Sequence, residues 1–291
     1  MKILFTADWH FRADTPICRK DDFFNTQKNT IVEIYDIAEA ESAGVIIVGD
    51  IFDKAKPDDS QILESFLIDQ FNRAPTKLIA GNHDLLYHKI ENKHKGSYGV
   101  LEKIFNNDQQ DGDGIKIHYF DYGVEITDCE DNGLYNIAMI HKYCDKDIPF
   151  FIKDGISTKD LFKNYNYDLF VTGDNHHFFL EVEKSSGRKI LNCGCITRQA
   201  SNFIDYIPMV HIFDTDTKEI KHIELSDTDK SAIDTGYMEE AKQRDERLIS
   251  FISKLQGDVD IDRSFKQNLK EYIATNKIPK KVEEKIWKVL Q

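Results

Sequence analysis

Short apolar segments that each stop at a histidine, aspartate or asparagine constrain this chain more than any other feature. The first three end at Asp8-Trp9-His10, at Gly49-Asp50-Ile51-Phe52-Asp53 and at Gly81-Asn82-His83-Asp84. Two later ones end at His141 and at Gly173-Asp174-Asn175-His176-His177. Each apolar segment has the length and composition of a buried strand. One polar residue after a strand is common, but five such strand ends are improbable by chance, so together they predict a functional site.

Helical patterns separate the first three of these strands. From Asp21 to Ala43 apolar residues recur at helical spacing, and Gly44 closes the pattern. A second helix is predicted from about Asp59 to Arg73, with its inner side formed by Ile62, Phe66 and either Ile68 or Phe71. Strands that alternate with helices form a parallel sheet, whose ligand crevice lies at the carboxyl ends of the strands. The sequence therefore predicts an α/β fold with the polar motifs at one edge of its sheet.

The later part of the chain is predicted to form a second sheet. Strands are expected at 115–127, 134–140 and 167–172. Four further segments between Phe178 and Leu225 are interpreted as an antiparallel meander within this second sheet, which packs against the first.

The C-terminal part has a different composition. Charged amphipathic helices are predicted at Tyr237–Leu255, at Phe265–Ile273 and from Pro279 onward. We therefore expect two parts, a domain at residues 1–228 and a small helical region at residues 229–291 that caps the domain or docks a partner. Simple self-packing of these helices is the alternative.

Composition limits the classes of partner. The net charge of −13 argues against a generic, sequence-blind polyanion binder, although bound divalent metal ions can reverse the sign of a local field. No apolar stretch approaches the roughly 20 residues of a membrane span, and we expect no charged-then-apolar leader. We expect a cytoplasmic protein with no membrane partner, and its five scattered cysteines are expected to be reduced structural thiols.

The residue types at the strand ends favour metal binding. Imidazoles and carboxylates without a thiolate are typical of a two-metal oxygen and nitrogen site for Mn, Fe or Zn, and less so of a structural zinc. The amide oxygen of Asn82 is a hard ligand suited to Mn, Mg or Fe, and His83 can donate a proton at neutral pH.

The order of the motifs resembles that of a known family. D-x-H, G-D-x-x-D, G-N-H-D, a lone strand-end His and a late G-x-x-H are similar to the pattern of calcineurin-like metallophosphoesterases over about residues 1 to 225. The resemblance implies a four-layer α-β-β-α sandwich with two mixed sheets. Within the superfamily, the first three motifs look most like the DNA-repair exonuclease branch, which includes the SbcD-type nuclease subunit and phage recombination nucleases. Asn192-Cys193-Gly194-Cys195 takes the place of the N-P-G-S stretch of that branch.

The resemblance also implies a set of metal ligands for two divalent ions. One ion would be held by Asp8, His10, Asp50 and His176, and the other by Asp50, Asn82, His141 and Asp174. Position 174 departs from the family, which usually has His there. A carboxylate at this position favours a hard ion, so Mn is expected before Mg, Fe or Zn.

The same resemblance assigns roles beside the metals. His83 would be the general acid that protonates the leaving oxygen, and Asp53 would orient its imidazole, unless Asp53 caps a following helix. Arg198 would bind a substrate phosphate, with an ordinary surface arginine as the alternative, and His177 is interpreted as a surface residue or an additional ligand. Trp9 and Phe11 flank the first motif, where they pack in the core or stack on a base.

The leading hypothesis is a metal-dependent DNA exonuclease, a phosphodiesterase of DNA repair or recombination. Its expected partners are DNA, an SbcC-type ATPase docked on the C-terminal helices, and a second copy of the chain. A phosphodiesterase or phosphatase for a small nucleotide is the second hypothesis, because one fold hosts both activities. The third is a catalytically weak adaptor that keeps the scaffold to bind partners.

Overall fold

A computed structural model describes residues 1–105, 114–130, 132–150, 152–236, 265–276 and 278–289 of the chain. The chain divides into two compact units, Met1–Thr235 and Gly236–Gln291. The division lies a few residues beyond position 228, because the intervening segment packs on the first unit. The Lys20 amide donates a hydrogen bond to the carbonyl of Ala232 at 2.9 Å, and the Asp234 amide donates one to the carbonyl of Cys18 at 2.6 Å.

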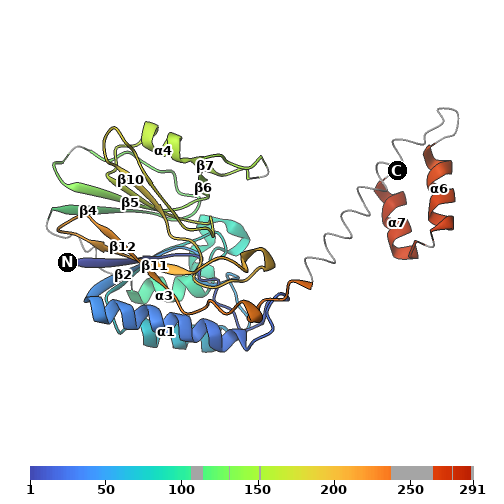
Figure 1. Cartoon of the computed structure of the whole chain (residues 1–291), viewed down its shortest axis with the longest axis horizontal. Helices are drawn as coiled ribbons and strands as arrows, with labels where there is room; N and C mark the ends of the chain where they lie inside the picture. Colours follow the sequence, from blue (N-terminus) through green and yellow to red (C-terminus); the bar gives the residue numbers. More distant parts are fainter. Residues whose placement is uncertain (106–113, 131, 151, 237–264, 277, 290–291) are drawn as a thin grey trace. The chain divides into compact units, whose positions relative to one another are not determined.

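The first unit begins with the alternation that the sequence predicts. Its elements are β1 (Lys2–Thr6), α1 (Phe23–Glu41), β2 (Ala43–Val48), α2 (Ser60–Phe71) and β3 (Thr76–Ile79). β1 pairs with β2 and β2 pairs with β3, both in parallel. Each crossover helix therefore returns the chain to the amino ends of the strands. The three polar motifs follow the carboxyl ends, which lie on one side of the sheet (Figure 1).

A second sheet faces the first. It contains β4 (Ile115–Phe120), β5 (Tyr135–His141), β8 (Leu169–Gly173), β10 (Lys189–Asn192) and β9 (Phe179–Val182) in the spatial order β4-β5-β8-β10-β9. Only β9 runs antiparallel to its neighbour, so the sheet is mixed. Two short strands, β6 (Cys144–Asp145) and β7 (Ile156–Ser157), form a small separate ladder.

The predicted single meander is wrong, because its four segments divide between the two sheets. β9 and β10 belong to the second sheet, whereas β11 (Met209–Asp214) and β12 (Ile220–Glu224) complete the first sheet in the order β12-β11-β1-β2-β3. β11 pairs with the free edge of β1 and β10 pairs with β8. Each hairpin is local, but the sheet that it extends is decided by which parallel strand offers an unpaired edge.

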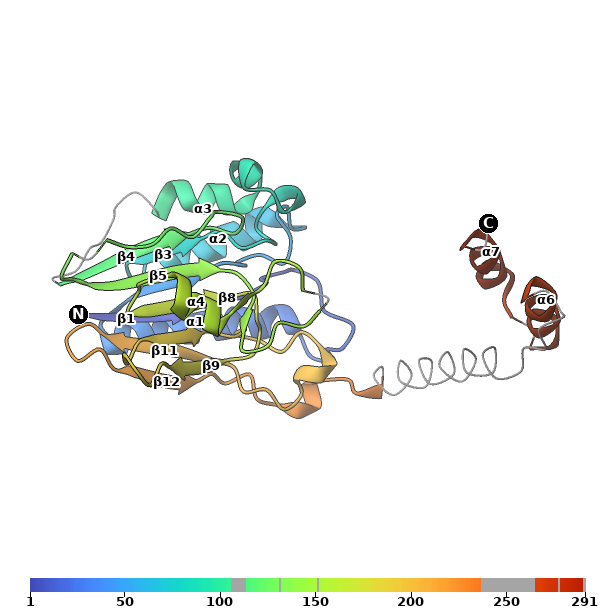
Figure 2. The same ribbon diagram turned by 90° about the horizontal axis from the view of Figure 1, so that it is seen from above.

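The layers follow the expected α-β-β-α sandwich. α1, α2 and α3 (Ser97–Phe105) cover the outer face of the first sheet, and α4 (Thr158–Asn164) lies on the outer face of the second (Figures 1 and 2). Between the sheets, Phe5 and Val48 from the first pack with Met139, Val171 and Leu191 from the second.

The inner faces of the two crossover helices were predicted with different success. The predicted stripe of α1 is buried as expected, at Ile31, Ile34, Tyr35 and Ala38. In α2 the buried residues are Leu63, Leu67 and Phe71, while Ile62 is 58% exposed. Apolar residues stand next to each other at 62/63 and 66/67, so helical spacing alone permits either face.

Short 3-10 helices and the C-terminal unit complete the structure. The 3-10 helices are η1 (Leu86–His88), η2 (Ile90–Lys95), η3 (Ser201–Phe203) and η4 (Lys230–Ala232). The C-terminal unit contains α6 (Phe265–Thr275), in which Leu269 and Ile273 are buried, and α7 (Lys280–Val289). The predicted helix at 237–255 lies outside the described residues. Among the described helices, none has the length and apolar character that crossing a membrane requires.

Candidate metal centre

The polar motifs meet at the carboxyl ends of strands from both sheets. Metal-ligating atoms of Asp8, His10 and His176 all lie within 4.8 Å of one another, and so do those of Asp8, Asp50 and His141. His10 Nε2 and His176 Nε2 are 3.1 Å apart. Asn82 joins the group from the loop after β3, with its Oδ1 3.1 Å from His141 Nε2. Residues separated by up to 168 positions, from 8 to 176, therefore share one neighbourhood.

Asp50 lies at the centre of this group. Its Oδ2 is 3.6 Å from His10 Nε2 and 3.3 Å from His141 Nε2, while Oδ1 accepts the backbone N–H of His83 at 2.8 Å. Oδ2 is buried and accepts no hydrogen bond. A buried carboxylate oxygen without a partner is costly, and a divalent cation between the histidines would satisfy it. The donors present thus fit the bridging position of a two-metal site.

The three histidines have the orientation of metal ligands, and His10 and His176 also have the neutral protonation state that ligands need. His141 donates its Nδ1–H to the carbonyl of Val48 at 2.7 Å, which leaves Nε2 facing the other donors. Burial lowers the pKa of His10 to about 3 and that of His176 to about 4, so both imidazoles are neutral at physiological pH.

The carboxylates are coupled to His141. Burial raises the pKa of Asp8 to about 8, against the opposing charge of His141. Burial alone would also raise the pKa of Asp50, but the positive charge of His141, whose Nε2 lies 3.3 Å from Oδ2, outweighs it and the pKa falls. The pKa of His141, which burial lowers, is raised to about 10 by the same contact with Asp50. Buried carboxyl groups beside an imidazole therefore form a site that strongly favours a bound cation.

The backbone around the site is strained and closely packed. Asp8, His10, Asp50 and Asp174 have φ values of 52°, 45°, 50° and 74°, in the left-handed region that non-glycine residues rarely occupy. The His10 amide donates to the carbonyl of Asp50 at 2.9 Å, which helps to hold this conformation. A Cβ at Gly81 would lie 2.1 Å from Asp50 Oδ1, so only glycine lets the loop after β3 approach this carboxylate.

Asp84 supports the site and was not assigned a role from the sequence. It is fully buried, and its carboxylate accepts the backbone N–H groups of Ile51, Phe52 and Gly81 at 3.2, 3.0 and 2.9 Å. Burial and then the charge of Asp50 raise its pKa to about 7. Asp84 thus ties the loop after β2 to the loop after β3. The signal in the sequence was its place at the end of Gly81-Asn82-His83-Asp84.

His83 is oriented by Asp53, but through the main chain. The Nδ1 of His83 lies 2.8 Å from the carbonyl oxygen of Asp53, and the ring is 4.7 Å from that of His10 in an edge-to-face contact. A ring nitrogen of His83 also lies within 4.8 Å of donor atoms of His10 and Asp50. The Asp53 carboxylate pairs instead with Arg12, at 3.1 Å. The alternative role of Asp53 as a helix cap is wrong, because α2 begins at Ser60 after Asp59.

Asp174 contributes to the site chiefly through its main chain. Its amide donates to both carboxylate oxygens of Asp8, at 3.0 and 3.2 Å. Burial raises the pKa of its own carboxyl group. The carboxylate belongs to none of the groups of closely spaced donor atoms found among the described residues. The sequence-based role as a ligand of the second ion therefore stays a prediction.

The prediction that Arg198 binds a substrate phosphate is wrong. Its side chain is 1% exposed, and its guanidinium donates to Asp227 at 3.2 Å and to the carbonyls of Ile204 and Asp229 at 3.2 and 2.9 Å. Arg19 pairs with the same Asp227 at 3.1 Å. A phosphate cannot reach a guanidinium in this position, and the residue instead fixes the segment around Asp227 to the domain.

A cleft beside the candidate ligands contains a different cation, Arg12. The cleft has a volume of about 200 Å³. It is lined by His10, Arg12, Asp53, His83, His176, Cys195, Thr197, Gln199, Ala200 and Phe203. Besides Asp53, the guanidinium of Arg12 pairs with Asp14, with Nε 3.0 Å from Oδ1. Trp9 and Phe11, by contrast, are 0% exposed and belong to the core, so neither can contact a base.

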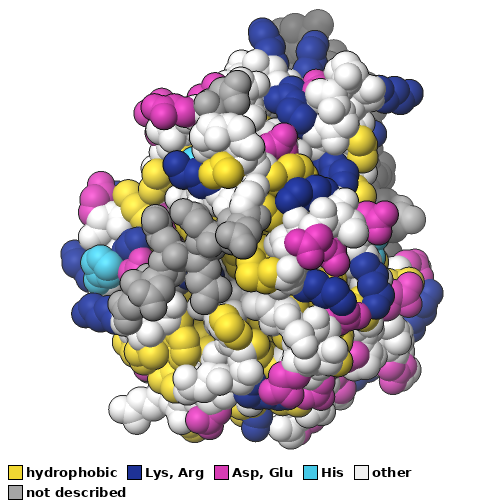
Figure 3. All heavy atoms as spheres, turned by 90° about the vertical axis from the view of Figure 1, so that its left-hand side faces the viewer, with side chains coloured by type: hydrophobic (Ala, Val, Ile, Leu, Met, Phe, Trp, Pro, Cys, Tyr) yellow, Lys and Arg dark blue, Asp and Glu magenta, His cyan; other side chains and the backbone are white. Residues whose placement is uncertain are grey.

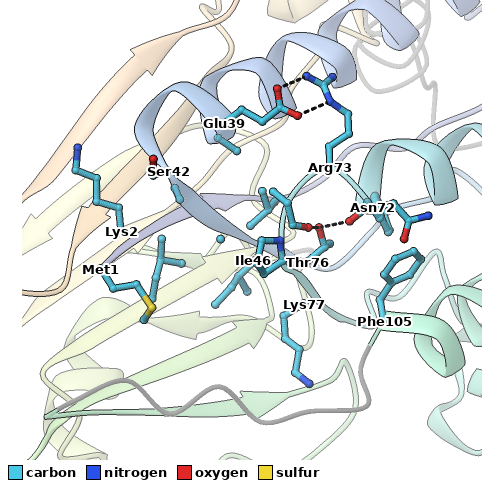
Figure 4. A pocket seen from close by; sticks show the side chains of 18 of the residues that line it. Met1, Lys2, Glu39, Ser42, Ile46, Asn72, Arg73, Thr76, Lys77 and Phe105 are labelled. Atoms are coloured by element: carbon cyan, nitrogen blue, oxygen red, sulfur yellow. Dashed lines mark hydrogen bonds and ion pairs between the residues drawn. The ribbon is translucent and has the colours of Figure 1, made fainter.

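A larger hollow lies at the opposite end of the same strands. It has a volume of about 860 Å³ and is lined at the amino ends of β1, β2 and β3 by residues such as Lys2, Gly44 and Thr76. Figure 3 shows hydrophobic side chains gathered on this face, and Figure 4 shows the ion pair of Glu39 with Arg73 at its border. None of the candidate metal ligands lines it, so the smaller cleft is the candidate active site despite its size.

The chain was compared with known protein families and with solved structures, and one family model matches it. A model described as calcineurin-like phosphoesterase matches residues 1–178. Solved structures similar to the chain include a novel archaeal phosphodiesterase, with 19% identity, a TM-score of 0.43 and coverage of 77% of this chain and 100% of that one. TT1561 of Thermus thermophilus has 10% identity, a TM-score of 0.47 and coverage of 77% and 98%. A metallophosphoesterase from Sphaerobacter thermophilus has 14% identity, a TM-score of 0.41 and coverage of 83% and 95%. No curated protein matches the chain.

Proposed function

This chain belongs to the calcineurin-like phosphoesterase family, and from that premise we propose that it is an exonuclease that hydrolyses the phosphodiester bonds of DNA. Metal-dependent phosphoester hydrolysis is the activity of the family, and the donor groups of the site fit it. The choice of DNA rests on the first three motifs, Asp8 to His10, Gly49 to Asp53 and Gly81 to Asp84, which resemble the DNA-repair exonuclease branch. A role in repair or recombination beside an SbcC-type ATPase is part of this proposal.

The observation that supports hydrolysis best is the unpartnered Oδ2 of Asp50 between His10 and His141. We assign Asp8, His10, Asp50 and His176 to one divalent ion, and Asp50, Asn82 and His141 to the other. Two such ions, when bound, lower the pKa of a shared water and clamp the phosphoryl oxygens of an in-line displacement. The carboxylate and amide oxygens among these donors favour a hard ion, so Mn is the proposed ion.

His83 is the proposed general acid. Its Nδ1–H donates to the carbonyl of Asp53, which fixes the ring and leaves Nε2 to hold the proton that the leaving oxygen receives. His83 lines the cleft together with the candidate ligands His10 and His176. The proton donor and the metal-holding groups are therefore presented to the same substrate.

Arg12 takes the phosphate-binding role that the sequence assigned to Arg198. Its side chain is 19% exposed and lines the cleft, where a guanidinium can meet a phosphate in the forked geometry that carboxylates and phosphates share. Asp14, one of its two carboxylate partners, is 54% exposed, so a phosphate can displace this carboxylate at modest cost. In a chain of net charge −13, such local cations are needed to attract a polyanion.

A phosphodiesterase for a small nucleotide is the second candidate. A cleft of about 200 Å³ is smaller than most ligand pockets and suits a single nucleotide unit. The acidic composition also favours a small substrate over a long polyanion.

One experiment separates these candidates. Purified full-length protein with Mn²⁺ is incubated with 5′- or 3′-labelled linear duplex DNA, with labelled single-stranded DNA, with closed circular DNA and with bis-p-nitrophenyl phosphate. An exonuclease shortens the linear DNA from an end, spares the circle and hydrolyses the ester. Cleavage of the circle indicates an endonuclease, and hydrolysis of the ester alone supports the small-nucleotide enzyme. Failure to hydrolyse any substrate contradicts the proposal.

A further inference from the structure

We propose that the exposed imidazole of His177, backed by Phe203, is a stacking platform for a nucleobase of the substrate, next to the phosphate that is cleaved. The location rests on the proposed phosphodiesterase function of the cleft. The inference makes esters that carry a nucleoside, rather than phosphodiesters in general, the preferred substrate class.

The first support is the geometry of the two rings. The rings of His177 and Phe203 are stacked, with centroids 4.4 Å apart and an angle of 13° between their planes. Phe203 is 8% exposed and is itself held by Tyr206 in an edge-to-face contact at 5.4 Å. His177 is exposed. One face of its ring is therefore covered by a buried aromatic side chain, and the residue still presents surface to solvent.

The second support is the rigid backbone at His177. Its amide donates to Asn175 Oδ1 at 3.2 Å, and its carbonyl accepts the side-chain N–H of Asn192 at 2.7 Å. Asn192 is fully buried and also accepts a hydrogen bond from Thr172 at 2.8 Å. A ring that is already ordered loses little conformational entropy when a base stacks on it.

The third support is the distance to the candidate metal ligands. Phe203 lines the cleft that His10, His83 and His176 also line, and its ring centroid is 6.0 Å from that of His176. The platform thus lies at the border of the cleft, within the reach of the nucleoside attached to a phosphate in it. Histidine and phenylalanine rings are among those on which unpaired bases stack, and such stacking tolerates any base.

Two other roles of His177 are disfavoured by its surroundings. Its nitrogens belong to none of the groups of closely spaced donor atoms among the described residues, which argues against a metal ligand. An aromatic side chain that only filled the core would be buried, as Trp9 and Phe11 are.

The test compares two small diesters with the same leaving group. Thymidine 5′-(4-nitrophenyl phosphate) carries a nucleoside, whereas methyl 4-nitrophenyl phosphate does not. His177→Ala is expected to lower kcat/KM for the thymidine ester by roughly 5- to 150-fold, mainly through KM, and to leave the methyl ester within about twofold. His177→Phe keeps a stacking face and is the matched control, so it should retain most of the preference for the thymidine ester.

Each contrary outcome identifies a different error. If kcat/KM falls equally for both esters, and His177→Ala and His177→Phe both lose metal, His177 is a metal ligand. Stacking would be wrong if His177→Ala leaves kcat/KM unchanged for both esters. It would also be wrong if both variants lower kcat/KM for the thymidine ester equally while the methyl ester is unaffected.

A binding measurement keeps the inference separate from the proposed function. An oligonucleotide with 2-aminopurine is titrated in Ca²⁺, and its fluorescence should be quenched by the wild type and by His177→Phe but less by His177→Ala. Equal quenching by all three proteins, or no binding by the wild type, overturns the platform even if the esters are hydrolysed. Quenching without hydrolysis of any ester would instead contradict the proposed function.

Discussion

The two ends of the strands β1, β2 and β3 differ in what their polar groups face. At the amino ends, the charged side chains around the larger hollow pair with one another at the surface, as Arg73 does with Glu39 at 2.9 Å and Lys2 with Glu41 at 2.6 Å. At the carboxyl ends, acids and imidazoles are buried together, and Asp50 Oδ2 has no hydrogen-bond donor. This difference shows that the volume of a cavity indicates a functional site less well than buried donor atoms that lack a partner in the protein.

The largest expected effect is at the centre of the carboxyl end. Asp50→Asn is expected to lower kcat by more than about 10⁴-fold, because both ions would share this carboxylate. Bound metal, measured by plasma mass spectrometry, should fall in parallel. Arg73→Gln removes a charge at the hollow and is the matched control, with unchanged kcat and metal content. If Asp50→Asn binds as much metal as the wild type, Asp50 does not hold the ions. The proposed difference between the two ends of the strands would then be wrong.

A smaller loss is expected where the metal-holding groups are left intact. His83→Ala should lower kcat by about 10²- to 10⁴-fold, the range for loss of a general acid, and should keep its bound metal. Metal analysis and steady-state kinetics on bis-p-nitrophenyl phosphate measure the two quantities. Loss of metal in this variant would make His83 a metal ligand instead. This outcome has to be tested because His83 lies close to His10 and Asp50.

Arg198 and Arg12 extend the comparison to two arginines near the site. Arg198→Met leaves Asp227 with one buried partner fewer and should lower the free energy of unfolding by about 3 kcal/mol, measured in urea. Arg12→Gln should change stability by less than about 0.5 kcal/mol, because its partners are partly exposed. The order reverses in catalysis, because only Arg12→Gln is expected to raise KM for the proposed DNA substrate. A raised KM in folded Arg198→Met would restore its predicted phosphate contact.

The stabilisation of the fold by bound metal is expected to be slightly smaller than the loss in Arg198→Met. Mn²⁺ at about 100 times its Kd should stabilise the fold by about 2.7 kcal/mol, and chelation with EDTA should reverse the rise in melting temperature. The same shift is expected in Arg73→Gln, and a much smaller one in Asp50→Asn. Identical shifts in Asp50→Asn and the wild type would place the ion away from the cluster.

Local patterns in the sequence carried a large part of the fold and of the candidate site. The parallel arrangement of β1, β2 and β3 follows from apolar segments separated by helical spacing. Because parallel strands end on one side, Asp8, Asp50 and Asn82 were predicted to meet, and the structure brings them together with His141 and His176. Such predictions succeed because strand direction converts position in the chain into position in space.

Tertiary contacts decided what local patterns could not. The burial of Arg198 depends on Asp227 and Arg19, which are 29 and 179 positions away along the chain. The stacking of His177 likewise depends on Phe203, and the sheets of β10 and β11 depend on the free edges of β8 and β1. Which residues gather at the carboxyl ends could be predicted from the amino-acid sequence, because strands and helices are recognised from local spacing. Which charged and aromatic side chains face solvent there could not be predicted, because their exposure depends on the distant segments that pack against them.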